Sequence, residues 1–173
     1  MDKTEENWES RITAVWVIAD SLSPEALLAA IDALAVERPV DDAAALFERA
    51  SARDRIGIEA EAEPLYRAAL ETGHLDAYRS SRASIQLGST LRILGQLAES
   101  ERLLTAELDR HMAPGNVRAL HNEARAFLAL TYVAQGRSVE AAGLALSALS
   151  PYLSRYNRSL TGNAAELVTK TWN

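Results

Sequence analysis

The sequence predicts an all-α protein, a chain of about nine helices packed as antiparallel hairpins. Its 173 residues include 32 Ala and 24 Leu against 8 Gly and 5 Pro, and this composition favours helices over strands. Apolar residues recur at steps of three and four along most of the chain, as on one face of a helix. The breaks between these segments are short, which makes neighbouring helices pack antiparallel.

Helix start and stop signals place each element in turn. The predicted helices span about residues 4–21, 24–38, 43–56, 59–72, 77–94, 98–111, 117–135, 138–150 and 153–170. Their predicted N-caps, whose side chains accept a hydrogen bond from the first turn, are Ser23, Asp41 or Asp42, Asp76 and Asn116. The predicted stops are glycines able to adopt a left-handed conformation, namely Gly57, Gly73, Gly95 and Gly136.

Charge and composition exclude several classes of function. The net charge is −6, and an acidic chain of this kind lacks the basic surface of a nucleic-acid binder. The absence of Cys excludes zinc-ribbon, iron–sulfur and thiol chemistry. No apolar run is long enough to span a membrane, and the first residues lack the pattern of a secretory signal, so we expect a cytoplasmic protein without nucleic-acid or membrane partners.

An internal repeat emerges when Gly57, Gly95 and Gly136 are aligned. Small residues then recur seven positions before and five positions after the glycine: Ala50, Gly88 and Ala129, followed by Ala62, Ser100 and Ala141. Four positions further on stand Tyr66, Leu104 and Ala145, and three beyond these Ala69, Glu107 and Ala148. The small side chains of the first two sets of positions let the two helices of a hairpin cross closely.

This pattern resembles the tetratricopeptide repeat, a 34-residue helical hairpin, and in particular the small bacterial three-repeat proteins of that family, which are thought to dimerise. The third unit resembles it most, through Leu128-Ala129, Tyr132, Gln135-Gly136-Arg137, Glu140-Ala141 and Ala148-Leu149. The resemblance implies a right-handed α-solenoid. Its parts would be a divergent N-terminal helical hairpin (1–40), three repeats in residues 41–150 (about 43–76, 81–114 and 122–150) and a C-terminal capping helix (151–173).

The same resemblance implies a non-catalytic scaffold or adaptor whose groove binds a peptide or partner helix. The implied groove residues are Ala44, Phe47, Ser51 and Asp54 from the first repeat, Arg82, Ile85, Ser89 and Arg92 from the second, and Glu123, Ala126, Leu130 and Val133 from the third. Arg82 and Arg92 would lie about 15 Å apart along one helix, a spacing that suits an acidic segment. The partner is unidentified, and we also expect a homodimer.

The three histidines show no metal-binding spacing, and no catalytic residue, metal or cofactor is predicted. Two other functions stay open: a small helical enzyme or ligand-binding protein that uses His121, Glu123 and nearby arginines, and a purely structural homodimer subunit. The apolar stripe of Trp8, Ile12 and Trp16 either packs against the chain's own helices or contacts a second chain.

Overall fold

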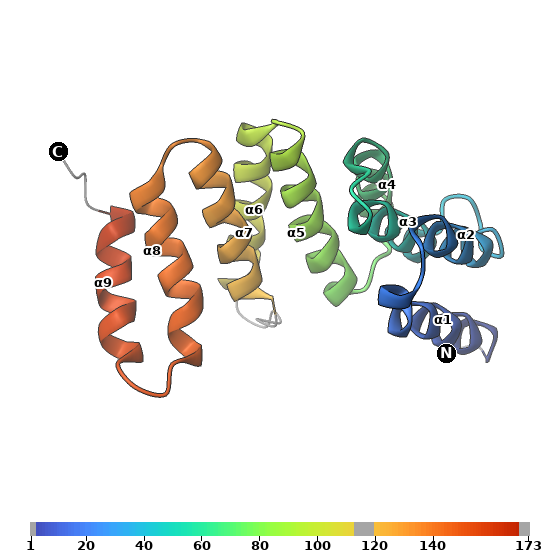
Figure 1. The fold of residues 1–173 in the computed structure, drawn as a ribbon, viewed down its shortest axis with the longest axis horizontal. Helices are drawn as coiled ribbons and strands as arrows, with labels where there is room; N and C mark the ends of the chain where they lie inside the picture. Colours follow the sequence, from blue (N-terminus) through green and yellow to red (C-terminus); the bar gives the residue numbers. More distant parts are fainter. Residues whose placement is uncertain (1–2, 113–119, 170–173) are drawn as a thin grey trace. The chain divides into compact units, whose positions relative to one another are not determined.

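The computed structural model describes residues 3–112 and 120–169, and this part of the chain contains helices and no strand (Figure 1). The all-α prediction is therefore confirmed. The α-helices are α1 (Lys3–Val17), α2 (Pro24–Ala35), α3 (Ala43–Arg55), α4 (Glu59–Glu71), α5 (Ala77–Ile93), α6 (Leu97–Met112), α7 (His121–Ala134), α8 (Ser138–Leu149) and α9 (Asn157–Thr169). None of the described helices is long and apolar enough to cross a membrane.

Three of the predicted N-caps are confirmed by their hydrogen bonds. The Ser23 hydroxyl accepts from the backbone N–H of Ala26 at 3.2 Å, and the Asp76 carboxylate accepts from that of Arg79 at 2.9 Å. Of the two candidates before α3, Asp42 is the cap, since its Oδ1 accepts from the N–H of Ala45 at 2.9 Å. The predicted cap Asn116 lies outside the described residues.

The predicted helix stops are also confirmed. The four stop glycines, Gly57, Gly73, Gly95 and Gly136, all have φ between 67° and 80°, where a residue with a Cβ is strained.

Several helix boundaries differ from the prediction, and the second helix, for example, ends at Ala35 and not at 38. The first helix ends at Val17 and is followed by a 3-10 turn, Ala19–Ser21, instead of continuing to residue 21. The last helix begins at Asn157 and not at 153, because a second 3-10 turn, Ser150–Tyr152, follows α8 and Tyr156 then adopts a φ of 65°. Such a left-handed residue cannot lie within a right-handed helix. The apolar periodicity begins before this residue, and for that reason the predicted start at 153 was too early.

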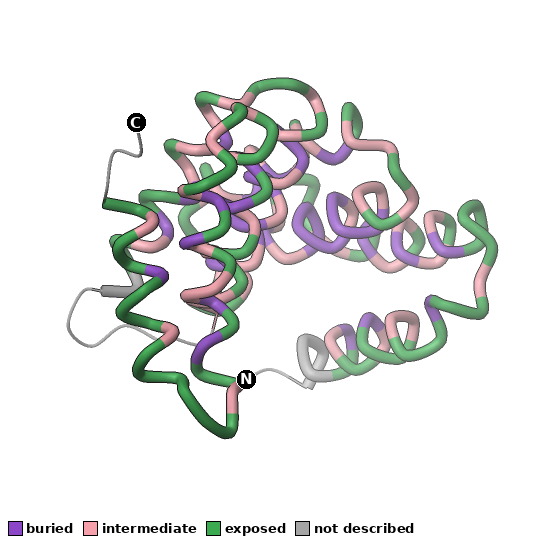
Figure 2. Tube along the Cα trace, turned by 60° about the vertical axis from the view of Figure 1, so that its left-hand side comes forward, coloured by how far each residue is buried: buried purple, intermediate pink, exposed green. Residues whose placement is uncertain are grey.

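The chain divides into two compact units, an N-terminal unit (Met1–Arg79) and a C-terminal unit (Ser80–Asn173). In each of them, buried residues recur at helical intervals along the trace, with exposed residues between them (Figure 2). The N-terminal unit contains a cluster built on Trp8, Ile12, Leu27 and Ile31 from α1 and α2. The C-terminal unit contains a cluster of Ile85, Leu104, Ala124 and Leu128 from α5, α6 and α7.

Small residues do permit close helix crossings in the C-terminal unit. The hydroxyl of Ser100 on α6 donates to the backbone carbonyl of Gly88 on α5 at 2.6 Å, and it lies 2.8 Å from the hydroxyl of Thr131 on α7. A larger side chain at Ser100 would separate these helices. The alignment of repeats thus identified positions where helix packing is tight.

Candidate functional site

The groove residues expected in the N-terminal unit lie largely inside it. Phe47 and Ser51 are buried, with the Phe47 ring 6.2 Å from that of Tyr66 on α4 and the Ser51 hydroxyl accepting from the Tyr66 hydroxyl at 3.4 Å. Asp54 is partly buried and accepts from the same hydroxyl at 3.3 Å. The expectation that Phe47 and Ser51 line a surface is therefore corrected: Tyr66 turns this face of α3 into the interior of the α3–α4 hairpin.

The expected groove residues of α5 are mixed. Ile85 is buried in the core of the C-terminal unit, which again corrects the expectation that it lines a surface. Arg82, Ser89 and Arg92 are partly exposed. The Nε of Arg92 is buried without a hydrogen-bond partner among the described residues.

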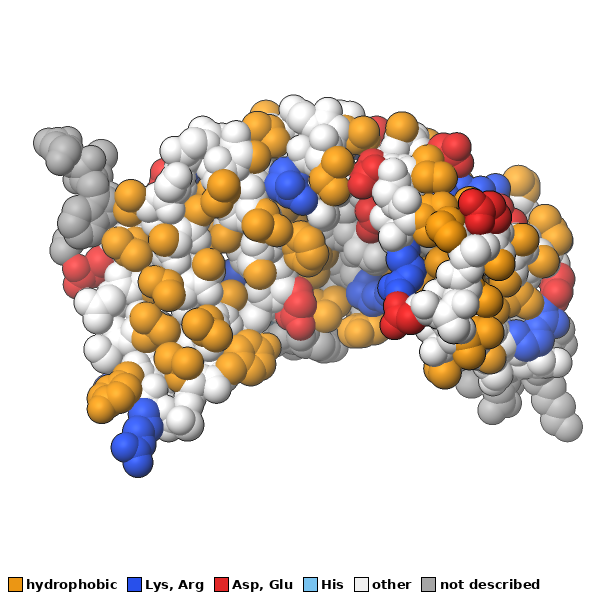
Figure 3. All heavy atoms as spheres, viewed as in Figure 1, with side chains coloured by type: hydrophobic (Ala, Val, Ile, Leu, Met, Phe, Trp, Pro, Cys, Tyr) orange, Lys and Arg blue, Asp and Glu red, His pale blue; other side chains and the backbone are white. Residues whose placement is uncertain are grey.

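The expected groove residues of α7 reach the surface. Glu123 is exposed, and so are Ala126, Leu130 and Val133. The last three line one shallow depression of about 500 Å³ between α7 and α8. Its complete lining is Ala126, Ala129, Leu130, Val133, Ser138, Ala141, Ala142 and Ala145. Figure 3 shows apolar side chains spread over the face of the C-terminal unit formed by α7, α8 and α9.

The repeat columns explain why the depression exists. In the third column, the α3–α4 hairpin has Tyr66 and the α5–α6 hairpin has Leu104, and both side chains are fully buried. The equivalent residue of the α7–α8 hairpin is Ala145, which is exposed and lines the depression with Ala129. A side chain that fills the first two hairpins is therefore missing from the third. Ala145 stands in the repeat alignment as a small residue, but the hollow that it leaves was not predicted from the sequence.

The lining of this α7–α8 depression limits what it can do. It consists of aliphatic side chains and one hydroxyl, with no carboxylate, imidazole, amine or guanidinium. Such a surface supplies no acid and no base to activate its one hydroxyl, whereas it can bury apolar side chains of another molecule. Its chemistry is that of a binding surface.

The apolar stripe of α1 packs within the chain. Trp8 and Ile12 are buried against α2, and the indole N–H of Trp8 donates to the carbonyl of Leu34 at 2.9 Å. The indole N–H of Trp16 donates to the buried carboxylate of Glu48 at 2.7 Å. Intramolecular packing, one of the two alternatives for this stripe, is thus the observed one. Trp8 and Ile12 are not available to a second chain, which corrects the expectation of a dimer contact there.

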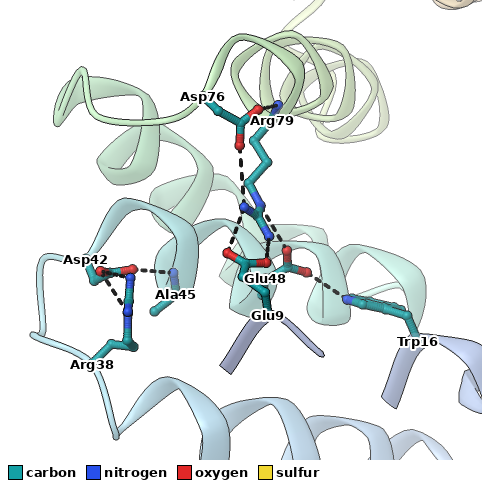
Figure 4. A network of polar contacts seen from close by, with 8 residues as sticks. All are labelled: Glu9, Trp16, Arg38, Asp42, Ala45, Glu48, Asp76 and Arg79. Carbon is teal, nitrogen blue, oxygen red and sulfur yellow. Dashed lines mark hydrogen bonds and ion pairs between the residues drawn. The ribbon is translucent and has the colours of Figure 1, made fainter. Parts of the chain in front are cut away.

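A second depression, of about 420 Å³, lies in the N-terminal unit and is polar. Arg79 is one of its lining residues and binds three carboxylates, those of Glu9, Glu48 and Asp76 (Figure 4). Burial alone would lower the pKa of Arg79, but the hydrogen bonds and charges of these carboxylates outweigh it and raise the pKa. Because the charges are committed to one another, the network ties α1, α3 and the start of α5 together.

The residues of the enzymatic alternative do not converge. His121 and Glu123 are two positions apart on α7 and therefore project about 200° apart around the helix. Glu123 is exposed, whereas His121 is partly buried. Among residues 3–112 and 120–169, no group of three or more His, Asp or Glu side chains is arranged to hold a metal ion.

Comparison with known proteins gives one match. A model of the tetratrico peptide repeat family matches residues 43–167, which is more than half of the chain. No curated protein and no solved structure matches it.

Proposed function

Because the chain belongs to the tetratricopeptide repeat family, we propose that it is a non-catalytic protein-interaction module that binds a partner segment in the α7–α8 depression. One observation carries this proposal. The depression is apolar and open, and Leu130 on its edge leaves 47% of its surface in water. An open apolar hollow of this kind is typical of a site for a partner's apolar side chains.

The shape of the α7–α8 depression supports the proposal, as its apolar lining does. Because Ala145 replaces the large buried residue of the other hairpins, the hollow has room for a side chain about the size of Leu or Tyr. A partner segment would place such a side chain against Ala129 and Ala145. We therefore propose an apolar anchor residue as the main recognition element, as in other interfaces that depend on one buried side chain.

Arg82 and Arg92 add a charge preference to this proposal. Both are partly exposed on α5 of the C-terminal unit. No residue of α5 is an Asp or a Glu. We propose that acidic residues of the partner flank its apolar anchor. Replacing both arginines by Glu would then weaken binding at low salt more than at high salt, because exposed charges are screened.

Quantitative capture experiments test the apolar site. Immobilised wild-type chain, Leu130→Gln and Ala145→Leu are compared for proteins retained from a lysate of the source cells, measured by mass spectrometry. Leu149→Gln is the matched control, since Leu149 is 49% exposed on α8 but does not line the depression. Both variants should lose at least about tenfold of a specific partner that the control retains.

The two variants probe different properties. Leu130→Gln makes the surface polar, whereas Ala145→Leu keeps it apolar and fills the hollow. Loss of the partner in both supports binding within the depression. Retention of the same proteins by wild type and both variants would contradict the proposal.

A further inference from the structure

The α2–α3 loop, residues 36–42 of the N-terminal unit, exposes apolar side chains. Val36 is 81% exposed and Val40 is 90% exposed, and Pro39 lies between them in the sequence. Valine side chains are usually buried, so two on one short loop are a notable exposed apolar surface. We call this surface the valine loop.

The charged residues of the valine loop are held by internal contacts. Glu37 forms an ion pair with Arg11 on α1. Arg38 pairs with Asp42 at 3.0 Å, and its guanidinium lies 5.0 Å from the ring centre of Trp8. The usual pattern of a loop is therefore inverted, with charges bound to the protein and valines facing water. Because these contacts already fix the loop, little conformational entropy is lost when it binds.

The valine loop carries one carboxylate that is not committed in this way. Asp41 follows Val40, is exposed, and has no hydrogen-bond or ion-pair partner among the described residues. On the C-terminal unit, Arg125 is partly buried and equally without a partner in the described chain. Arg125 stands one turn before Ala129 on α7, and so on the same side of that helix as part of the α7–α8 depression.

The environment of Arg125 favours an added anion. Its pKa is lowered by burial alone, since no carboxylate offsets the loss of hydration. The two units also carry net charges of opposite sign. Residues 1–79 hold 17 acidic and 8 basic residues, whereas residues 80–173 hold 7 acidic and 10 basic residues. The acidic unit thus carries an apolar loop that includes the Asp41 carboxylate, and the basic unit carries an apolar hollow and, on α7, the Arg125 guanidinium.

We propose that the valine loop of one copy of this chain docks in the α7–α8 depression of a second copy, with Asp41 of the first beside Arg125 of the second. This inference rests on the proposed function, because it names the partner of the same depression. The two surfaces differ, so the contact is heterologous and head-to-tail. After one contact the first copy keeps an unused depression and the second keeps an unused loop, so the assembly grows unless it closes into a ring.

Two variants that each destroy one surface provide the test. Val36→Gln/Val40→Gln changes the loop, and Ala145→Leu fills the depression. Sedimentation velocity over a concentration series should show the wild type rising above the monomer mass, with each variant monomeric alone. Their equimolar mixture should form a dimer and nothing larger, because each variant supplies the surface that the other lacks. Recovery in the mixture also shows that both variants are folded.

The control is Val17→Gln, since Val17 is 78% exposed on the same unit but lies outside the valine loop. It should associate as the wild type does. A charge exchange tests the ion pair: Asp41→Arg and Arg125→Asp should each weaken self-association at least about tenfold, and mixing these two variants should restore the opposed charges and the association.

Several outcomes would overturn the inference. These are a wild type that stays monomeric at every concentration, a loop variant that associates like the wild type, or two variants that fail to combine. These results do not bear on the proposed function, which the capture experiment tests independently. If Ala145→Leu loses a captured partner while the wild type is monomeric, the depression binds a different protein.

Discussion

Gly88 and Leu104 lie so close that a Cβ atom added to Gly88 would stand 2.6 Å from Cγ of Leu104. Leu104 is fully buried and belongs to the core of the C-terminal unit, so it has little room to move. This contact is where α5 and α6 cross. It explains why the repeat column that contains Ala50 and Ala129 has Gly at this position.

Gly88→Ala should destabilise the C-terminal unit by about 1–3 kcal/mol, because the added methyl overpacks a rigid contact. Urea unfolding followed by far-UV circular dichroism measures the change, and hydrogen exchange in residues 80–112 assigns it to this unit. Gly162→Ala is the matched comparison, since Gly162 is inside α9 and nothing lies within 4 Å of an added Cβ. It should stabilise by roughly 0.5–1 kcal/mol through helix propensity. Equal effects of the two substitutions would refute the argument.

Gly143→Ala should loosen α9 from α8. The added Cβ would stand 2.8 Å from the backbone carbonyl oxygen of Ala164 and 2.7 Å from Cγ2 of Val168, and a backbone atom cannot move aside as a side-chain tip can. Hydrogen exchange in Asn157–Thr169 should therefore quicken, whereas that of α5 should change little. Unchanged exchange in α9 would show that this helix adapts without leaving its place.

The hydrogen bond from Trp16 to Glu48 should contribute measurably to stability. Glu48 is almost fully buried, and a buried carboxylate that loses a donor costs about 1–3 kcal/mol. A double-mutant cycle with Trp16→Phe and Glu48→Gln isolates this contact from the packing of the indole ring. We expect a coupling energy of about 1 kcal/mol or more in urea unfolding, and additive effects would argue against it.

Acid should weaken the contact between α2 and α3 through Asp32. Burial raises the pKa of Asp32, but hydrogen bonds from Arg53 and Arg49 outweigh it, so the net pKa is lowered. A carboxyl whose folded pKa is below the unfolded value stabilises the fold above that unfolded value, about 3.9, and loses this contribution as the pH falls through the folded pKa.

Asp32→Asn should therefore lower stability at neutral pH and reduce the loss of stability below about pH 4. Urea unfolding of wild type and variant at several pH values between about 2 and 7 measures both effects. Glu101 and Glu140, whose pKa values are also lowered, are unchanged in the variant and provide a constant background. Parallel pH profiles of the two proteins would contradict the assignment to Asp32.

Part of the candidate site was implied by the resemblance to the tetratricopeptide repeat, which places Ala126, Leu130 and Val133 in a groove. Ala126, Leu130 and Val133 are three or four residues apart, so helical geometry alone places them on one face of α7. The hollow that they line could not be predicted in the same way. It depends on Ala145 of α8, which lies beside Ala129 only after the hairpin has closed.

Burial of the other expected groove residues also depended on partners distant in sequence. Phe47 and Ser51 face Tyr66, and Ile85 faces Leu104 and Leu128, so these side chains are interior although their repeat positions suggested a surface. Two buried carboxylates were not anticipated either. Glu48 is held by Trp16 and Arg79, and Glu107 by Arg110. Their sequence neighbourhood resembles that of an ordinary exposed glutamate.

The sequence by itself determined the helices, most of their ends and the positions of close crossing, because caps, stop glycines and apolar spacing act between residues at most a few positions apart. Only the tertiary structure decided which faces are covered. Trp8 and Ile12 pack against α2, and the α7–α8 hairpin keeps an open apolar hollow. Both features follow from contacts between separate helices. Such contacts depend on side-chain volume summed over several elements, which no local pattern contains.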